Sequence, residues 1–120
     1  MKVCVPTMEN GGLDDMVAQH FGRAPTYTIV DIETNAVEVI PNISEHTGGT
    51  GVPPEYIAPT GTHIMLCSGL GPKAVTMFEE YGIDVFVGAS GTVQDAVAAW
   101  QKGLLSEATD ENACSEHRHE

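Results

Sequence analysis

The stretch CSGLGPKA, residues 67–74, is the part of this 120-residue chain that decides the fold. An apolar run at 64–66, typical of a buried strand, comes before it, and residues 74–81 after it have the pattern of a helix. Gly69 and Gly71 permit a left-handed backbone or the close approach of a ligand, and Pro72 suits a first helical turn. The stretch therefore predicts a strand, a tight turn and a helix.

A strand that ends in such a turn also predicts a place for an anion. The free N–H groups of the first helical turn and the helix dipole both favour negative charge. Cys67 stands at the end of the strand, the edge of an open α/β sheet where ligands bind. The alternative is a plain strand–helix connection with a buried cysteine. The candidate residues here are Cys67, Gly69, Leu70 and Gly71.

Length and composition are those of a single domain with a substantial core. The hydrophobic content is 42%, and no apolar run approaches the length of a membrane span. Residues 1–5 enter a strand pattern directly, without the layout of a signal peptide. The three cysteines are far apart, which is typical of free thiols in a reducing compartment. We therefore expect a cytoplasmic protein.

The charge balance excludes two classes of partner. Five Lys and Arg residues stand against 17 Asp and Glu residues, for a net charge of −12. Nucleic acids and anionic membranes require a basic patch, which five scattered cations cannot form. Such acidity also opposes an anionic ligand, unless local N–H groups outweigh the global field.

The order of predicted elements indicates an α/β fold. A hairpin precedes alternating helices and strands, which implies a mixed five-stranded sheet with one antiparallel strand and helices on both faces, a three-layer α/β/α arrangement. We expect a domain at residues 1–105 and an acidic, mobile tail at 106–120. The predicted strands are 2–6, 26–32, 36–40, 63–67 and 83–88, and the predicted helices are 54–58, 74–81 and 92–102.

Four stretches together resemble the NifX/NifB C-terminal family of dinitrogenase iron–molybdenum cofactor biosynthesis domains. They are HFGRAP at 20–25, a glycine-rich loop at 44–54, GLGPKA at 69–74 and YGIDV at 81–85. The resemblance covers roughly residues 1–105. It implies a ribonuclease-H-like motif, the binding or carriage of a metal–sulfur cofactor, and cofactor-assembly proteins as partners. The glycine loop keeps only His46 where the family is often richer in histidine, so we expect backbone N–H groups to form the cradle.

The predicted pocket lies between the loop at 20–25, the glycines at 48–51 and the turn at 69–71. Arg23 would neutralise an anionic cluster, and His20 or Cys67 would ligate a metal at the rim. Loop hydrogen bonding is the alternative role for His20 and Arg23, and core packing is the expected role of Cys4. The cofactor-binding candidates are His20, Phe21, Gly22, Arg23, Gly48, Gly49, Gly51, Cys67, Gly69, Leu70 and Gly71.

The C-terminal tail carries a second candidate site. Cys114, His117 and His119 place three soft or borderline ligands within six residues, a set suited to zinc, copper or nickel. The alternative is adventitious metal binding by an exposed tail, since structural zinc sites usually draw ligands from two segments.

No enzyme constellation is recognisable in the sequence. A nucleophile elbow, a Walker loop and a zinc-protease helix are all missing. Nuclease chemistry on a ribonuclease-H fold needs converging carboxylates, yet the first strand carries Val3, Cys4 and Val5. We expect a non-catalytic carrier of an iron–molybdenum or related metal–sulfur cofactor. The alternative is a regulatory module that binds a phosphate or nucleotide-type ligand.

Overall fold

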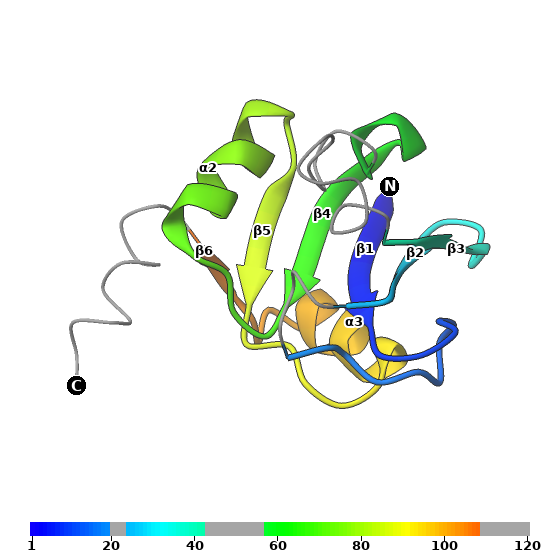
Figure 1. Ribbon diagram of the computed structural model, residues 1–120. Helices are drawn as coiled ribbons and strands as arrows, with labels where there is room; N and C mark the ends of the chain where they lie inside the picture. The colour runs from blue at the N-terminus through cyan, green and yellow to red at the C-terminus, as the bar shows by residue number, and fades with distance from the viewer. Residues whose placement is uncertain (20–23, 43–56, 109–120) are drawn as a thin grey trace.

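The computed structural model describes residues 1–19, 24–42 and 57–108. In this part of the chain the strands form one six-stranded sheet in the order β3-β2-β1-β4-β5-β6 (Figure 1). The strands are β1 (Lys2–Thr7), β2 (Thr26–Asp31), β3 (Val37–Pro41), β4 (Thr62–Cys67), β5 (Asp84–Val87) and β6 (Ser106–Ala108), and the helices are the 3-10 turn η3 (Ala58–Thr60), α2 (Pro72–Glu80) and α3 (Val93–Gln101).

The strand directions confirm a mixed sheet but correct its size. β1, β4 and β5 are parallel neighbours, while β2 is antiparallel to both β1 and β3. The predicted five strands with one antiparallel strand are therefore wrong in both numbers, because β6 adds a sixth strand and, being antiparallel to β5, joins β2 as a second antiparallel strand. β6 has only three residues and two of them are exposed, so it gives no alternating apolar pattern.

β6 lies beyond the residue at which we expected the domain to end. Ala108 is 1% exposed and pairs with Val85, so the packed domain continues at least three residues past residue 105. Residues 109–120 lie outside the described part of the chain, and the tail remains a prediction there.

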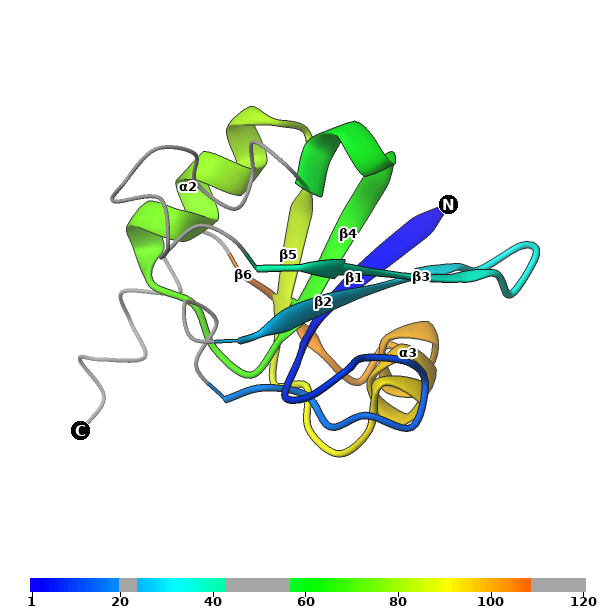
Figure 2. The same ribbon diagram turned by 45° about the vertical axis from the view of Figure 1, so that its right-hand side comes forward.

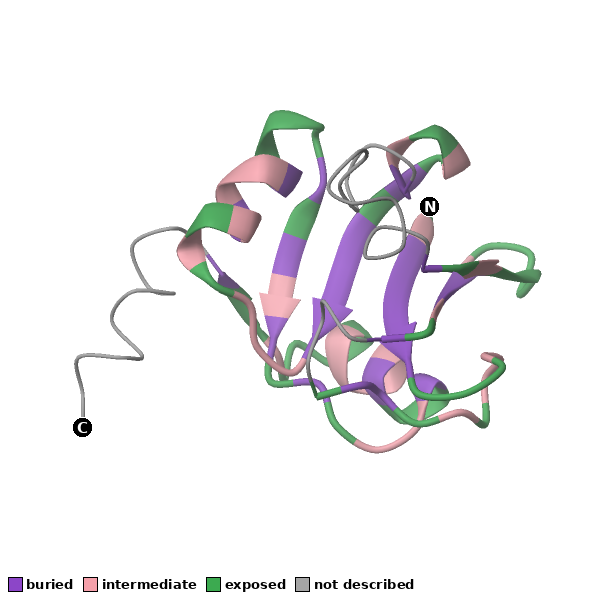
Figure 3. Ribbon diagram, in the orientation of Figure 1, coloured by how far each residue is buried: buried purple, intermediate pink, exposed green. Residues whose placement is uncertain are grey.

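The two faces of the sheet carry separate apolar clusters, which confirms the three layers. The α2-side cluster joins Cys4, Met65 and Val85 of the sheet to Phe78 of α2. The α3-side cluster joins Val5 and Leu66 to Val93 and Ala96 of α3. Figure 2 shows α2 and α3 on opposite sides of the sheet. Because β1 and β4 lie between the two clusters, most of their residues are buried (Figure 3).

Both described α-helices begin within two residues of the predicted starts, α2 at Pro72 instead of residue 74 and α3 at Val93 instead of residue 92. α2 starts after Gly71 with Pro72 in its first turn, and α3 starts with a capping box between Thr92 and Asp95. The ring of Trp100 meets Phe86 of β5 edge to face, with centroids 6.3 Å apart, which fixes α3 against the sheet. No helix in the described ranges is long and apolar enough to cross a membrane.

The pairing of β6 makes the C-terminal boundary testable. Deleting residues 106–120 should lower the free energy of unfolding by about 1–3 kcal/mol, because ladder hydrogen bonds to β5 are lost and apolar surface at Val85 is uncovered. Deleting only residues 109–120 should leave this free energy unchanged. Urea unfolding of the two truncated chains checks the boundary. If deleting residues 109–120 lowered the free energy of unfolding as much as deleting residues 106–120, the predicted boundary would be wrong.

Candidate functional site

A cavity of about 500 Å³ opens at the edge of the sheet where the parallel strands end. Segments that follow β1, β4 and β5 gather there, at the lower edge in Figure 1. This is the edge at which ligands enter open α/β sheets, and the volume suits a small cofactor. In the described part of the chain the cavity is lined by Met8, Met16, Val17, Ala18, Gln19, Pro25, Ser68, Ser90 and Gly91.

Backbone hydrogen bonds hold the segment at 16–19 across the ends of the strands. The N–H of Val17 donates to Gly91 O at 2.9 Å, and the N–H of Ala18 donates to Pro6 O at 2.9 Å. The N–H of Met8 donates to Met16 O at 3.2 Å. The first wall of the cavity is therefore fixed by main-chain contacts and does not depend on particular side chains.

The opposite wall joins the ends of β4 and β5. The hydroxyl of Ser68 donates to Ala89 O at 3.0 Å, and the N–H of Gly88 donates to Ser68 O at 3.1 Å. The N–H of Ala89 donates to Cys67 O at 3.0 Å. These bonds fix the position of the residue that comes directly before the glycine turn at 69–71.

The two described α-helices start near this edge but differ in what their first turns offer. At α3 the N–H of Val93 donates to Asp15 O and that of Gln94 to Leu13 O, while the capping box uses the N–H of Asp95. At α2 the cap residue is Gly71, which has no side chain to accept a hydrogen bond. Within the described residues, no hydrogen-bond partner meets the N–H of Lys73 or Ala74. Of these two helix starts, only that of α2 is open to an anion.

Gly69 and Gly71 are not required by the conformation of the turn. Neither has a positive φ, and Gly71 is extended with φ −69° and ψ 159°. A Cβ atom at either position would meet no heavy atom within 4 Å. By contrast, Gly88 and Gly91 have φ of 98° and 79°, where only glycine is comfortable. Neither glycine therefore uses a left-handed backbone, and the close approach of a ligand at 69–71 remains a prediction.

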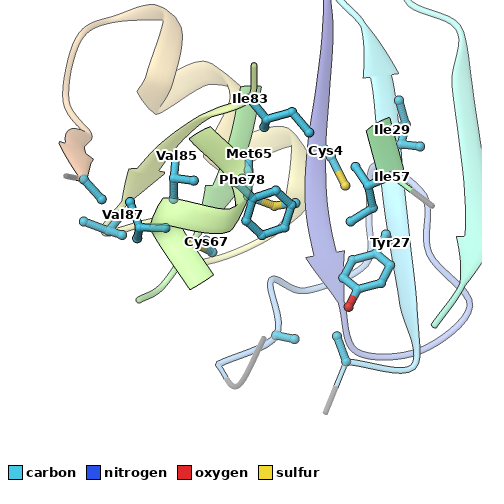
Figure 4. Packing of buried hydrophobic residues seen from close by; sticks show 14 residues of the cluster. Cys4, Tyr27, Ile29, Ile57, Met65, Cys67, Phe78, Ile83, Val85 and Val87 are labelled. Atoms are coloured by element: carbon cyan, nitrogen blue, oxygen red, sulfur yellow. The ribbon is translucent and has the colours of Figure 1, made fainter. Parts of the chain in front are cut away.

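The described cysteines belong to the core. Cys4 and Cys67 are 0% and 1% exposed and lie within the α2-side cluster (Figure 4). Burial raises the pKa of the Cys4 thiol above its ordinary value, and the nearby Cys67 raises it further. The thiol of Cys67 donates to Phe86 O at 3.8 Å. This placement favours the packing role for both residues over ligation of a metal at the rim.

Most predicted site residues lie outside the described ranges. In the predicted turn at 69–71, Leu70 packs against the α2-side cluster. The lining of the cavity includes Ser68, which precedes this turn, but it does not include Gly69, Leu70 or Gly71. The undescribed candidates are His20, Phe21, Gly22, Arg23, Gly48, Gly49, Gly51, Cys114, His117 and His119.

The residues that flank two of these segments do lie at the cavity edge. Gln19 and Pro25, on either side of residues 20–23, line the cavity. Asn42, which precedes residues 43–56, donates from Nδ2 to Ala24 O at 2.7 Å and from its N–H to Pro25 O at 2.9 Å. The convergence of the three predicted segments remains a prediction, but Gln19 and Pro25 line the cavity and Asn42 is hydrogen-bonded to Pro25.

Sequence reasoning missed several lining residues. Met8 and Met16 are half-exposed, and Ser90 and Gly91 belong to the loop before α3. A pair of methionines in a polar loop is an unusual pattern and was the available signal. In the described residues no group of three or more His, Cys, Asp and Glu side chains is arranged to hold a metal ion.

Comparison with known proteins gives consistent matches over nearly the whole domain. The family model described as dinitrogenase iron-molybdenum cofactor matches residues 1–103. The uncharacterized protein MJ0580 of Methanocaldococcus jannaschii is 29% identical over 111 residues, which cover 88% of this chain and 89% of that protein.

Two solved structures share the fold at similar identity. The apo form of the orange protein from Desulfovibrio gigas has a TM-score of 0.77 and 30% identity, over 89% of this chain and 92% of its own. TM1290 from Thermotoga, provisionally assigned as a NifB protein, has a TM-score of 0.71 and 28% identity, over 88% and 91% of the two chains.

Matched glycine substitutions test which glycines the fold needs. Gly91→Ala should lower the free energy of unfolding by about 1–2 kcal/mol, because φ is positive and the new Cβ would lie 2.7 Å from Asp95 Oδ2. Gly71→Ala, the same chemical change, should stay within about 0.5 kcal/mol of the parent chain. Thermal or urea unfolding measures both. Equal losses would show that the turn at 69–71 is also a requirement of the fold.

Proposed function

Because the chain belongs to the dinitrogenase iron-molybdenum cofactor family, we propose that it binds and carries a preformed metal–sulfur cofactor. The cofactor is the cargo of the protein, an iron–molybdenum or related molybdenum or iron cluster. In this proposal the protein shields the cluster and performs no bond chemistry. Its partners are cofactor-assembly proteins that deliver or receive the cluster, and its place is the cytoplasm.

One observation carries the proposal, namely the open start of α2 behind two glycines that the fold does not need. The N–H groups of Lys73 and Ala74 and the positive end of the helix dipole favour an anion. Without side chains at 69 and 71, a large ligand can approach the main chain directly. Local attraction of this kind is what an anionic cluster requires in a protein of net charge −12.

The undescribed segments complete the proposed cradle. Arg23 adds a permanent charge with planar donors, and His20 supplies a ligand at the rim. Phe21 and Gly22 belong to the same loop, and Gly48, Gly49 and Gly51 present successive N–H groups as an anion nest. Support comes from Gln19, Pro25 and Asn42, which bring the described ends of these segments to one edge.

The finer description of the fold is also a proposal. A ribonuclease-H-like motif is supported by the hairpin β2–β3, which lies in the sheet beside the parallel strands β1, β4 and β5. The first strand of that motif offers Val3, Cys4 and Val5, which are buried and carry no carboxylate. This supports a carrier role over metal-ion nuclease chemistry.

The alternative function is a module that binds a phosphate or nucleotide-type ligand at the same helix start. That ligand class matches the open N–H groups of α2 equally well. A phosphate or nucleotide-type ligand leaves two observations unexplained, namely the half-exposed methionines at the cavity and the family to which the chain belongs. An ultraviolet–visible spectrum of protein purified without oxygen separates the two functions, because a metal–sulfur cluster absorbs visible light and a phosphate ligand does not.

Cluster reconstitution tests the cradle. Arg23→Ala and Gly71→Val should each weaken cluster binding about tenfold or more, because the first removes charge and the second blocks approach to the main chain. Cys67→Ala should retain binding, since this thiol lies in the core. Anaerobic titration followed by visible absorption and metal analysis gives the affinities.

The variants contain their own control for folding. Gly71 precedes a proline and has an extended backbone, with φ −69° and ψ 159°. Valine adopts this conformation without strain. Loss of binding in Gly71→Val with an unchanged melting temperature is therefore a loss of the site. If only Cys67→Ala loses the cluster, a thiolate site replaces the cradle.

The tail site is proposed separately. Cys114, His117 and His119 should bind zinc or copper at about one ion per chain, and binding should weaken below about pH 6 as the histidines take up protons. Calorimetric titration of the full chain and of a chain ending at Ala113 makes the comparison. Equal affinity in the shorter chain would assign the metal to another place.

A further inference from the structure

β3 is an edge strand whose outer side is open. In the described part of the chain it is the last strand on its side of the sheet (Figure 2). Four of its five residues are exposed, among them Val37 and Val39, which are 41% and 38% exposed. β6, at the other end of the sheet, has only three residues. Of the two edges that the structure describes, β3 is therefore the longer one.

Hydrogen bonds at both ends of the β2–β3 ladder fix which backbone groups of β3 face outward. The N–H of Asp31 donates to Ala36 O at 2.9 Å, and the N–H of Asn42 donates to Pro25 O at 2.9 Å. The register between these two bonds is unbroken. Hydrogen-bonded and non-hydrogen-bonded pairs alternate along an antiparallel ladder. The even-numbered residues of β3 therefore bond to β2, and the odd-numbered residues point their N–H and C=O groups away from it.

The outward groups are the N–H and C=O of Val37 and Val39 and the C=O of Pro41. Pro41 has no N–H, but it is the last residue of the strand and does not interrupt the row. Lysine is a common means by which proteins prevent pairing at a sheet edge, and β3 contains none. The edge therefore keeps the donors and acceptors that are needed to add one strand.

The charges around this edge select the kind of strand. Residues 24–42 contain Asp31, Glu33 and Glu38 but no Lys or Arg. The N-terminal ammonium lies 4.0 Å from Asp31 Oδ1 and 3.7 Å from Glu33 Oε2, whereas Glu38 has no ion pair among the described residues. A second copy of the chain would bring another net charge of −12 and another Glu38 to the same edge. Charge complementarity therefore favours a basic segment of another protein over self-pairing.

The two faces of β3 define the side-chain pattern that fits. Val37 lies opposite Val30 of the α3-side cluster, and Val39 shares its face. Glu38 lies opposite Ile29 of the α2-side cluster, on the other face. In an added strand, every second residue would lie beside the exposed valines and the residues between them beside Glu38. An alternation of apolar and basic residues therefore matches both faces.

We propose that β3 is a docking edge for an extended segment of another protein in which apolar and basic residues alternate. The segment adds one further strand to the sheet and pairs with Val37, Val39 and Pro41. This inference goes beyond the proposed function, because it does not depend on what the cavity binds. Asn42, directly after β3, is hydrogen-bonded to Pro25 of the cavity lining, so the docked segment lies close to the cavity.

Hydrogen exchange of the unaltered chain tests the pairing. Without a partner, the amides of Val37 and Val39 should exchange fast and those of Glu38 and Ile40 slowly, because only the latter two bond to β2. The probe is a peptide of about seven alternating Lys and Val residues. At saturating peptide the exchange of the Val37 and Val39 amides should slow about tenfold or more. Unchanged exchange of both amides would show that the docking edge is wrong.

Two comparisons separate strand pairing from general attraction to an acidic chain. A peptide of alternating Lys and Pro has the same charge but cannot pair as a strand, so it should bind about tenfold more weakly. Glu38→Lys should weaken binding of the Lys–Val peptide about threefold to tenfold. Glu80→Lys is the matched control, because it makes the same change of charge at an exposed position of α2. It should bind the peptide nearly as the parent chain does.

The remaining outcomes separate this proposal from its rivals. NMR titration gives the affinities, and equal losses in Glu38→Lys and Glu80→Lys would show that the attraction is general and that the proposal is wrong. If the Val37 and Val39 amides are protected without peptide and lose this protection on dilution, a second copy occupies the edge instead. A chain that binds a reconstituted cluster but not the peptide keeps the carrier function and loses the docking edge.

Discussion

The parallel alignment of β1, β4 and β5 is the constraint on which the site depends. Parallel strands need crossover connections, so each strand ends at the same edge and the chain must leave from there. The segments after Thr7, Cys67 and Val87 consequently meet, although about 60 residues separate the first from the second. Burial on both faces stabilises this alignment, because β1 and β4 lie between the two apolar clusters and pack against both.

The proposed function sets an acidic protein against an anionic cargo, and the same edge offers a way to reconcile them. A net charge of −12 repels anions at long range, but screening limits that repulsion to roughly a Debye length of about 8 Å at physiological salt. The described lining of the cavity is neutral, and the start of α2, with its oriented N–H groups, follows the lining residue Ser68 but does not itself line the cavity. Under the proposed carrier function such a balance is useful, because attraction that is local and moderate would permit release of the cluster to a partner.

The sequence predicted the parts of the fold that repeat a local pattern. The capping box at Thr92 and Asp95, Pro72 at the start of α2 and the hairpin of β2 and β3 each depend on a few neighbouring residues. β6 was missed because its pairing with β5 is a tertiary contact of a three-residue segment. Met8 and Met16 were missed for the same reason, since only the bridge between Thr7 and Val17 brings them together.

The glycines show why a site is harder to predict than a fold. In the sequence, the glycines at 69, 71, 88 and 91 look alike, and each permits either an unusual backbone or a close approach. Their backbone conformations differ, because Gly88 and Gly91 have positive φ and Gly69 and Gly71 do not. A glycine with a positive φ is explained by the fold alone. A glycine without a positive φ and with open space around its missing side chain is not, because a Cβ atom there would meet no heavy atom within 4 Å. Two such positions lie beside an uncapped helix start, and this is the arrangement on which the proposed anion site rests.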